Sequence, residues 1–260
     1  QEPTDGTFGL EATDQVLELR TLLTVDRVQS SSPGLLVVHE GDSGSAGGIL
    51  GYLALIPGDH TDLEIAVDRP LVDGEQLSLM LHEDTNQNLI LEPGTDLPVI
   101  GSDGHTESVV ITVAVPPGTP DIRIHFAAQG NEAWDLISAD PGLEFVLEGT
   151  AVLNPTLRLT AGWRYHIWNE SYASHPFELL TIRSDGADVA LLSQSQGGYL
   201  EDDPAVDFVR DVAWIEDGDS FLFTMTPALA EDLTNYRCSA HRQAMRGEIV
   251  VVDPERRQRT

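Results

Sequence analysis

Residues 236–251 read YRCSAHRQAMRGEIVV, a short strand-like run, a polar loop and a second, β-branched run. The loop places a thiol, an imidazole and a thioether within eight residues, at Cys238, His241 and Met245. Thiolate and thioether sulfur suit Cu(I), and imidazole suits copper in both oxidation states. This stretch therefore predicts two neighbouring strands joined by a loop that offers three ligands to one soft metal ion.

A second histidine for such a site must come from another part of the chain. His175 follows the apolar run 165–168 and precedes the run 177–182, so we expect it on a loop at a strand end. A β-sandwich can bring that loop beside 238–245. Zinc is the chemical alternative to copper, because one Cys and two His also bind zinc, although zinc rarely takes Met.

Short apolar or alternating runs bounded by Gly, Pro, Asp and Asn recur along the chain, and these are typical of strands. Examples are 34–39, 63–67, 77–81 and 109–115. Helical patterns are short and confined to 227–233 and 204–209. The sequence predicts an all-β protein of two β-sandwiches. The linker PPGTP at 116–120 cannot continue a central strand, so we expect an Ig-like sandwich in 1–118 and a second sandwich in 119–260.

Charge excludes several classes of partner. Arg supplies all 14 basic residues of the 260-residue chain, against 43 Asp and Glu, and the net charge is −29. Such a field repels nucleic acids and anionic membranes, and no apolar run is long enough for membrane insertion. Self-repulsion of this size favours a saline setting, where salt screens the charges.

Cysteine usage and the first residues bear on the compartment. The single cysteine excludes an internal disulfide, and an exposed thiol would oxidise outside the cytoplasm, which favours a metal-ligand role for Cys238. The sequence starts at Gln1 without an initiator Met or an apolar leader segment. We expect a mature exported chain, periplasmic or secreted.

The second half resembles the cupredoxins, the type 1 blue copper proteins related to plastocyanin. An early His and a C-terminal Cys–His–Met loop carry the resemblance, which covers roughly 120–252 and places the ligands at His175, Cys238, His241 and Met245. The resemblance implies a Greek-key sandwich with one type 1 copper. It also implies that Cys238 couples electronically to the metal and that Met245 is a weak axial ligand that tunes the potential.

Copper enzymes of the same fold need further histidines, in His-x-His pairs or at a second copper. None of the eight histidines here forms a His-x-His pair. A single copper with saturated ligands has no open position for a substrate. We therefore expect no enzymatic activity, but a one-electron carrier between Cu(I) and Cu(II) that works with a redox protein partner. A copper chaperone or storage protein, and an electron-relay subunit of a larger copper oxidoreductase, remain the alternatives.

Three arginines, Arg237, Arg242 and Arg246, crowd the ligand loop of this acidic chain. They either form a docking surface for an acidic partner and raise the potential, or pair with nearby carboxylates. A polar, acidic segment at 193–204 separates His175 from Cys238, and it is either a partner surface or a solvated loop.

The first half, over 20–115, resembles an uncharacterised β-sandwich domain common in exported proteins of salt-loving archaea and some bacteria. Asp84, Asn86 and Asn88 place oxygen donors at alternate positions, as a calcium loop does, so a calcium site is a further hypothesis. The half also contains four histidines that could form a second metal site, although their spacing fits no motif. These are His39, His60, His82 and His105.

Overall fold

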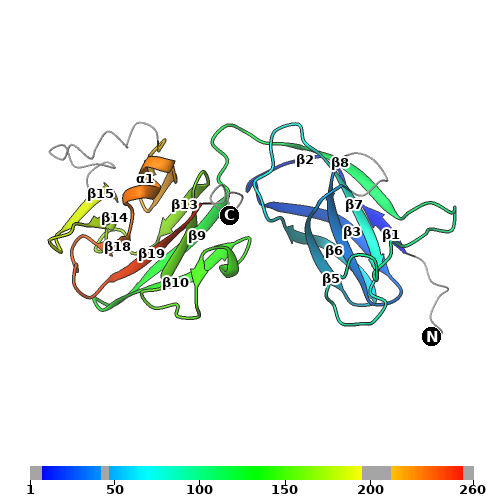
Figure 1. Cartoon of the computed structure of the whole chain (residues 1–260), viewed down its shortest axis with the longest axis horizontal. Coiled ribbons are helices and arrows are strands. Elements are labelled where there is room, and N and C mark those ends of the chain that lie inside the picture. The colour runs from blue at the N-terminus through cyan, green and yellow to red at the C-terminus, as the bar shows by residue number, and fades with distance from the viewer. Residues whose placement is uncertain (1–7, 42–46, 195–211, 254–260) are drawn as a thin grey trace. The chain divides into compact units, whose positions relative to one another are not determined.

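A computed structural model describes residues 8–41, 47–194 and 212–253 of the chain. The chain divides into two compact units, Gln1–Thr119 and Pro120–Thr260, which we call the first and the second unit. Strands dominate both units, which confirms the all-β expectation (Figure 1). The described helices are one-turn or two-turn elements, and none has the length and hydropathy of a membrane-spanning segment.

The described residues of the first unit form eight strands in two sheets. They are β1 (Gly9–Glu11), β2 (Gln15–Val16), β3 (Leu22–Ser30), β4 (Gly34–Glu40), β5 (Ile49–Leu55), β6 (Gly58–Ala66), β7 (Gln76–Glu83) and β8 (Ser108–Ala114). One sheet has the order β1-β3-β6 and the other β2-β8-β7-β4-β5. Leu36 and Val38 of β4 face a core that also buries Leu23 and Val25 of β3. The central strands β4 and β7 are nevertheless buried on both faces.

The second unit is a sandwich of a five-stranded and a six-stranded sheet. Its elements are β9 (Ile122–Gln129), β10 (Ala133–Asp140), η1 (Leu143–Phe145), β11 (Leu147–Glu148), β12 (Thr156–Thr160), β13 (Arg164–Asn169), β14 (Phe177–Ile182), β15 (Asp188–Ser193), β16 (Ile215–Asp217), β17 (Ser220–Thr224), α1 (Pro227–Asp232), β18 (Asn235–Cys238) and β19 (Arg246–Val252). The sheet orders are β10-β9-β13-β17-β16 and β11-β12-β19-β18-β14-β15.

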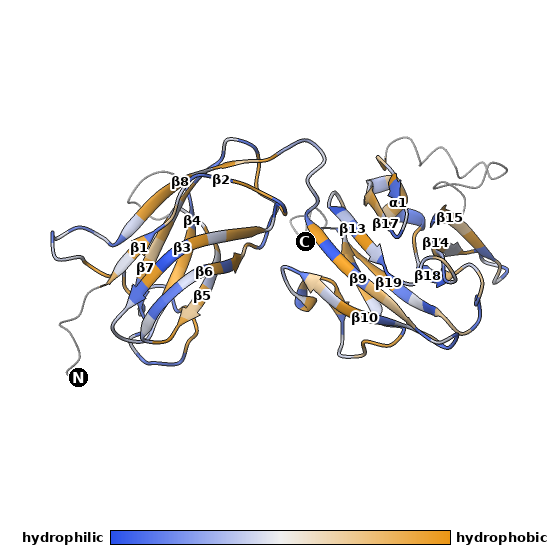
Figure 2. Ribbon diagram, turned by 180° about the vertical axis from the view of Figure 1, so that it is seen from behind, coloured by the Kyte–Doolittle hydropathy of each residue, from blue (hydrophilic) through white to orange (hydrophobic). Residues whose placement is uncertain are grey.

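Alternation of apolar and polar residues positions the core of the second unit. In β9, Ile122, Ile124 and Phe126 are buried while the residues between them are partly exposed, as expected for a strand with one face inward. Figure 2 shows the same alternation as changes of colour along β9. Aromatic and aliphatic side chains of both sheets fill the space between them, among them Trp134 and Tyr165 of the five-stranded sheet and Phe177 of the six-stranded sheet.

The helix expected over 227–233 is present as α1. Thr226 caps it by accepting a hydrogen bond from the backbone N–H of Leu229 at 3.2 Å, and Pro227 occupies the first turn, where its missing N–H costs nothing. The helical pattern at 204–209 lies outside the described residues, as does most of the polar segment 193–204.

Candidate metal centre

Strand pairing brings two of the expected ligands to the same end of one sheet. Strands β14 and β18 are antiparallel neighbours, and Phe177 stands opposite Cys238. His175 lies two residues before Phe177, on the loop that enters β14, while Cys238 is the last residue of β18. The backbone N–H of Ser239 donates to the carbonyl of Pro176 at 2.9 Å and ties the two loops together.

The three side chains of His175, Cys238 and His241 converge on one point. The Cys238 Sγ atom lies 3.8 Å from His175 Nδ1 and 3.7 Å from His241 Nδ1, and the two Nδ1 atoms are 3.1 Å apart. Metal bonds to imidazole and thiolate are about 2.0–2.3 Å long, so donors on one ion lie about 3–4 Å from each other. The group therefore fits a single metal ion.

Met245 is held next to Cys238 by the backbone of the loop. The N–H of Cys238 donates to the Met245 carbonyl at 2.8 Å, and the N–H of Met245 donates to the His241 carbonyl at 3.0 Å. The Met245 side chain is fully buried in the core that also contains Cys238. The loop thus folds back on itself and holds the backbone of Met245 next to Cys238, with the Met245 side chain buried in the same core.

Two buried amides, Asn169 and Gln194, fix the His175 loop. Asn169 Nδ2 donates to the His175 carbonyl at 2.8 Å and to Gln194 Oε1 at 3.0 Å, and Gln194 Oε1 also accepts from the N–H of Phe177 at 3.2 Å. Both side chains are fully buried, so these bonds are made in a medium where an unpaired amide would be costly. The His175 ligand loop is therefore held in place by the protein itself.

A third amide, Asn154, fixes the Met245 side of the site. Its Nδ2 donates to the Ala244 carbonyl at 2.9 Å, and its Oδ1 accepts from the N–H of Trp134 at 2.9 Å. Asn154 has φ +46°, a left-handed conformation that Asn tolerates better than most residues. Asn154, Asn169, Gln194 and Trp134 were not among the residues expected from the sequence.

The surroundings keep the site dry and His175 neutral. Burial lowers the pKa of His175, and the neighbouring His241 lowers it further, which favours the unprotonated imidazole that metals bind. The Trp134 ring packs edge-on against His175, with ring centroids 6.3 Å apart, and Phe177 stacks on Tyr236 next to it. Cys238 is fully buried, whereas His241 is partly exposed, so solvent meets the site at His241.

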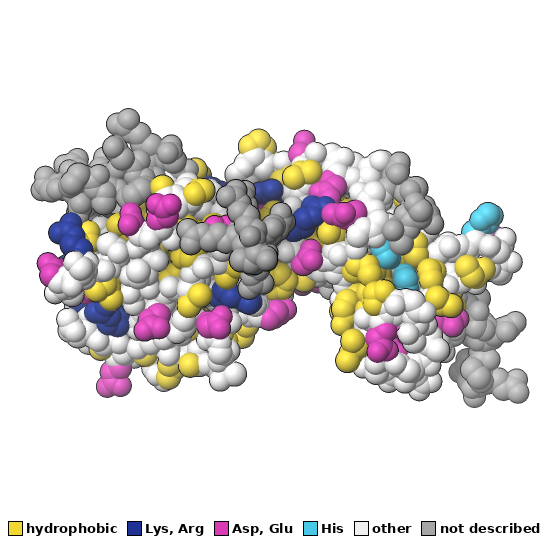
Figure 3. Space-filling model, viewed as in Figure 1, with side chains coloured by type: hydrophobic (Ala, Val, Ile, Leu, Met, Phe, Trp, Pro, Cys, Tyr) yellow, Lys and Arg dark blue, Asp and Glu magenta, His cyan; other side chains and the backbone are white. Residues whose placement is uncertain are grey.

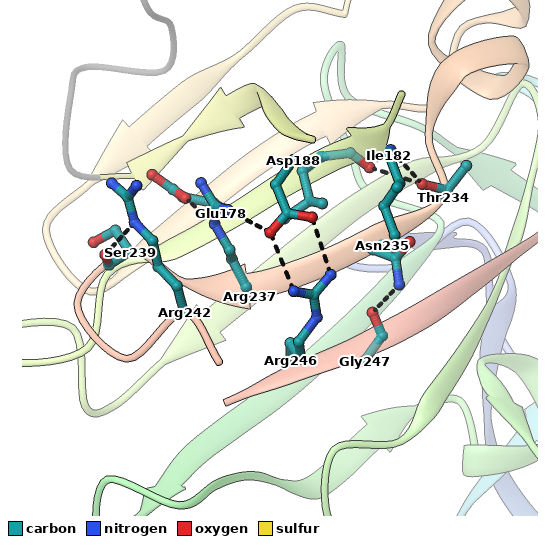
Figure 4. Close-up of polar contacts among 11 residues, drawn as sticks. Glu178, Ile182, Asp188, Thr234, Asn235, Arg237, Ser239, Arg242, Arg246 and Gly247 are labelled. Carbon is teal, nitrogen blue, oxygen red and sulfur yellow. Dashed lines mark hydrogen bonds and ion pairs between the residues drawn. The ribbon is translucent and has the colours of Figure 1, made fainter. Parts of the chain in front are cut away.

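The arginines at the ligand loop differ from one another, and Arg237 follows the second of their two alternatives, because it pairs with nearby carboxylates. Its side chain is only 6% exposed, with Nε 2.7 Å from Glu178 Oε2 and an NH1 nitrogen 2.8 Å from Asp188 Oδ2. Arg246 also binds Asp188, at 3.1 Å (Figure 4). The strand β18 runs through Arg237, so the residue belongs to a sheet rather than to a loop. Arg242 is exposed and its Nε donates to the Ser239 carbonyl.

Lowering the pH should reduce the free energy of unfolding of the second unit, because Asp188 becomes protonated. Hydrogen bonds and charge from Arg246, and then from Arg237, hold the pKa of Asp188 below its usual value. A carboxylate of this kind stabilises the fold above its unfolded pKa of about 4, and the stabilisation is lost as pH falls through the folded pKa. We expect Asp188→Asn to lower the free energy of unfolding at pH 7, with the difference from wild type shrinking below pH 4. Urea unfolding followed by tryptophan fluorescence measures the free energy of unfolding of both proteins at each pH. The exposed Glu231→Gln is the control. A difference between wild type and Asp188→Asn that stays constant with pH would contradict the prediction.

The proposed calcium residues form a hydrogen-bonded turn. Both carboxylate oxygens of Asp84 accept backbone N–H groups, from Asn88 at 3.1 Å and Leu89 at 2.8 Å. The side-chain oxygens of Asn86 and Asn88 accept from the N–H two residues further on, and both side-chain amides donate to Glu92. These hydrogen bonds account for the positions of the three side chains without a cation, and we do not propose a calcium site here.

Comparisons with known proteins include one family match within the first unit. Residues 9–114 match the family described as "Domain of unknown function (DUF7282)". "Cell surface glycoprotein 2" of Haloarcula hispanica is 36% identical over 95 residues, which are 35% of this chain and 10% of that protein. The chain therefore spans about a tenth of the length of this curated relative.

Solved structures resemble the chain only distantly. A biofilm-associated protein BSP domain is 10% identical with a TM-score of 0.27, covering 95% of this chain and 30% of its own. A multicopper oxidase from Campylobacter jejuni is 12% identical with a TM-score of 0.21, covering 92% of this chain and 55% of its own. TM-scores this low do not establish a shared fold over the whole chain. The match to this family of unknown function extends from β1 to β8.

Proposed function

We propose that the second unit binds one copper ion as a type 1 centre and that the protein is an exported one-electron carrier serving a redox protein partner. The convergence of His175 Nδ1, Cys238 Sγ and His241 Nδ1 at separations of 3.1–3.8 Å carries this proposal. One thiolate, two imidazoles and a nearby thioether make a ligand set that selects copper. When bound, copper would supply the Cu(I)/Cu(II) couple.

The protein's part is to hold the ligands still during electron exchange. Cys238 is fixed by the β14–β18 pairing, His175 by Asn169, and Met245 by its backbone bonds to Cys238 and His241. Ligands fixed in this way need little rearrangement when the metal changes its oxidation state, because hydrogen bonds outside the metal shell set their positions. This favours fast electron transfer over storage of the metal.

His241 is the expected route for the electron. It is the one partly exposed ligand of the three, whereas Cys238 and His175 are buried. Arg242 follows it in the chain and is exposed, so a partner with an acidic surface would find a cation there. Figure 3 shows acidic side chains spread over both units, together with several arginines.

A copper chaperone or storage protein is less well supported. Such proteins need ligands that a partner or chelator can reach, but Cys238 and Met245 are both fully buried. For the compartment, the net charge of −29 and the cell-surface relative from Haloarcula hispanica favour an extracytoplasmic, saline location.

The test is a reversible redox titration of the copper-loaded protein in a high-salt buffer. We expect an intense visible band from charge transfer between thiolate and copper, bleached by ascorbate and restored by ferricyanide with one electron per bound copper at this site. A Cu(I) chelator added to the reduced protein should leave that copper in place. A colourless protein that takes up zinc, or rapid loss of the copper to the chelator, would overturn the carrier proposal.

A further inference from the structure

Two histidines of the first unit meet in its interior. His39 on β4 and His82 on β7 belong to neighbouring antiparallel strands, and their Nε2 atoms are 3.4 Å apart. In the register His39 pairs with Ser78 and His82 pairs with Leu35, so both side chains lie on the same face of the sheet. Their exposed fractions are only 2% and 7%.

The outer nitrogens of the two rings determine where the protons lie. His82 Nδ1 is 2.9 Å from the Asp96 carbonyl, and His39 Nδ1 is 3.3 Å from the Gly47 carbonyl. A carbonyl can only accept, so each Nδ1 must carry a hydrogen, and a neutral ring then has its lone pair on Nε2. Two lone pairs then face each other at 3.4 Å, an arrangement that a cation between them, either a proton or a metal ion, stabilises.

Each ring also makes the hydrogen bond that is typical of a metal-bound histidine. A metal-bound histidine usually donates its other ring N–H to a carbonyl or carboxylate, which fixes the tautomer and the ring orientation. His39 and His82 each do so. Two nitrogens that bind one ion at about 2 Å and at a trigonal angle lie about 3.5 Å apart, close to the 3.4 Å separation here.

A third soft donor shares the face. Met80 lies two residues before His82 on β7 and stands opposite Val37 of β4, between the two histidines in the register. Its side chain is 2% exposed. Among the residues that the structure describes, no further His, Cys, Asp or Glu joins the pair to make a cluster of three. Two imidazoles and a thioether without a carboxylate suit Cu(I) better than zinc or calcium.

We propose that His39 and His82, together with Met80, bind one Cu(I) ion inside the first unit. This site shares no residue with the centre at Cys238 and does not depend on its function. The 43-residue separation of the two histidines matches no metal motif because the β4–β7 register, and not a loop, brings them together.

Anaerobic titration with Cu(I), in competition with a chromophoric Cu(I) chelator, tests the site in the full chain. We expect the wild-type protein to hold two equivalents and His82→Gln to hold one, with the visible band of the oxidised Cys238 centre unchanged. Cys238→Ser should retain the equivalent that depends on His82. The exposed His105→Gln is the matched control in the same unit and should hold two. Equal uptake by the wild type and His82→Gln would overturn the proposal.

A measurement on the unaltered chain covers the case in which His82→Gln misfolds. Long-range proton–nitrogen NMR of the histidine rings reports whether each Nε2 is free, protonated or metal-bound, with Ag(I) as a diamagnetic substitute for Cu(I). We expect the Nε2 signals of His39 and His82 to shift together on adding Ag(I) and to show coupling to silver. An Nε2 that stays protonated in excess Ag(I) would mean that the pair shares a proton, and the metal site would be wrong.

Discussion

Cys238→Ser should abolish the intense visible band of the copper-loaded protein. The band requires charge transfer from a thiolate sulfur, and serine offers a hard hydroxyl that copper binds weakly. His175 and His241 remain in place in the variant, so some copper binding persists without this intense band. Absorption spectra at equal copper loading measure the effect.

Ser239→Ala is the matched control for this substitution. Ser239 is the next residue in the chain, and its contact with the His175 loop is a backbone bond to the Pro176 carbonyl that alanine keeps. We expect its spectrum to equal that of the wild type. A Cys238→Ser protein that remains coloured would show that the thiolate is not the source of the band. Circular dichroism of both metal-free variants establishes that they are folded.

Arg237→Met should destabilise the second unit by about 3–5 kcal/mol, the cost of leaving a buried charge without its partner. The guanidinium and the Glu178 carboxylate are 2.7 Å apart with 6% and 5% of their side chains exposed. Removing the cation leaves Glu178 with a hydrogen bond from Ser193 Oγ at 3.4 Å. The double variant Arg237→Met, Glu178→Met should recover much of the loss, since it removes both charges.

Urea unfolding at fixed salt concentration measures this effect in the intact chain. All four tryptophans, at positions 134, 163, 168 and 214, belong to the second unit, so their fluorescence reports that unit alone. The exposed Arg242→Met is the control, and we expect a change within about 0.5 kcal/mol. Additive losses in the double variant would contradict the buried pair, because they would mean that the two side chains act independently.

Local patterns in the sequence are sufficient to predict which of these segments form strands and which forms a helix. The runs expected at 34–39 and 77–81 lie within β4 and β7, and the short helix begins at the expected Pro227. These elements depend on alternation and on capping, which neighbouring residues determine. Which strands become neighbours depends on packing over long separations. The β4–β7 register, and with it the approach of His39 to His82, therefore could not be predicted.

The candidate metal centre shows the same difference between local and long-range features. The sequence order of Cys238, His241 and Met245 made one loop the obvious source of ligands, and His175 followed from its place between two strand-like runs. Glu178, by contrast, stands between Phe177 and Leu179 and has the pattern of a solvent-facing strand residue, yet it is buried. The sheet carries a further strand, β15, on its outer side, and Asp188 on that strand closes an ion pair with Arg237 that no local pattern reveals.

The pairing of β14 with β18 is also expected to be a slow step in folding. His175 and Cys238 are 63 residues apart in the chain, and contacts of this separation form slowly because a long loop must close first. Until they form, the single thiol is open to oxidants and to other chains, and the ligand set does not exist. The closing of this one strand pair both shields the sulfur and assembles the site. If the second unit binds copper as proposed, the rate of this pairing sets the fraction of newly folded molecules that reach copper with a reduced cysteine.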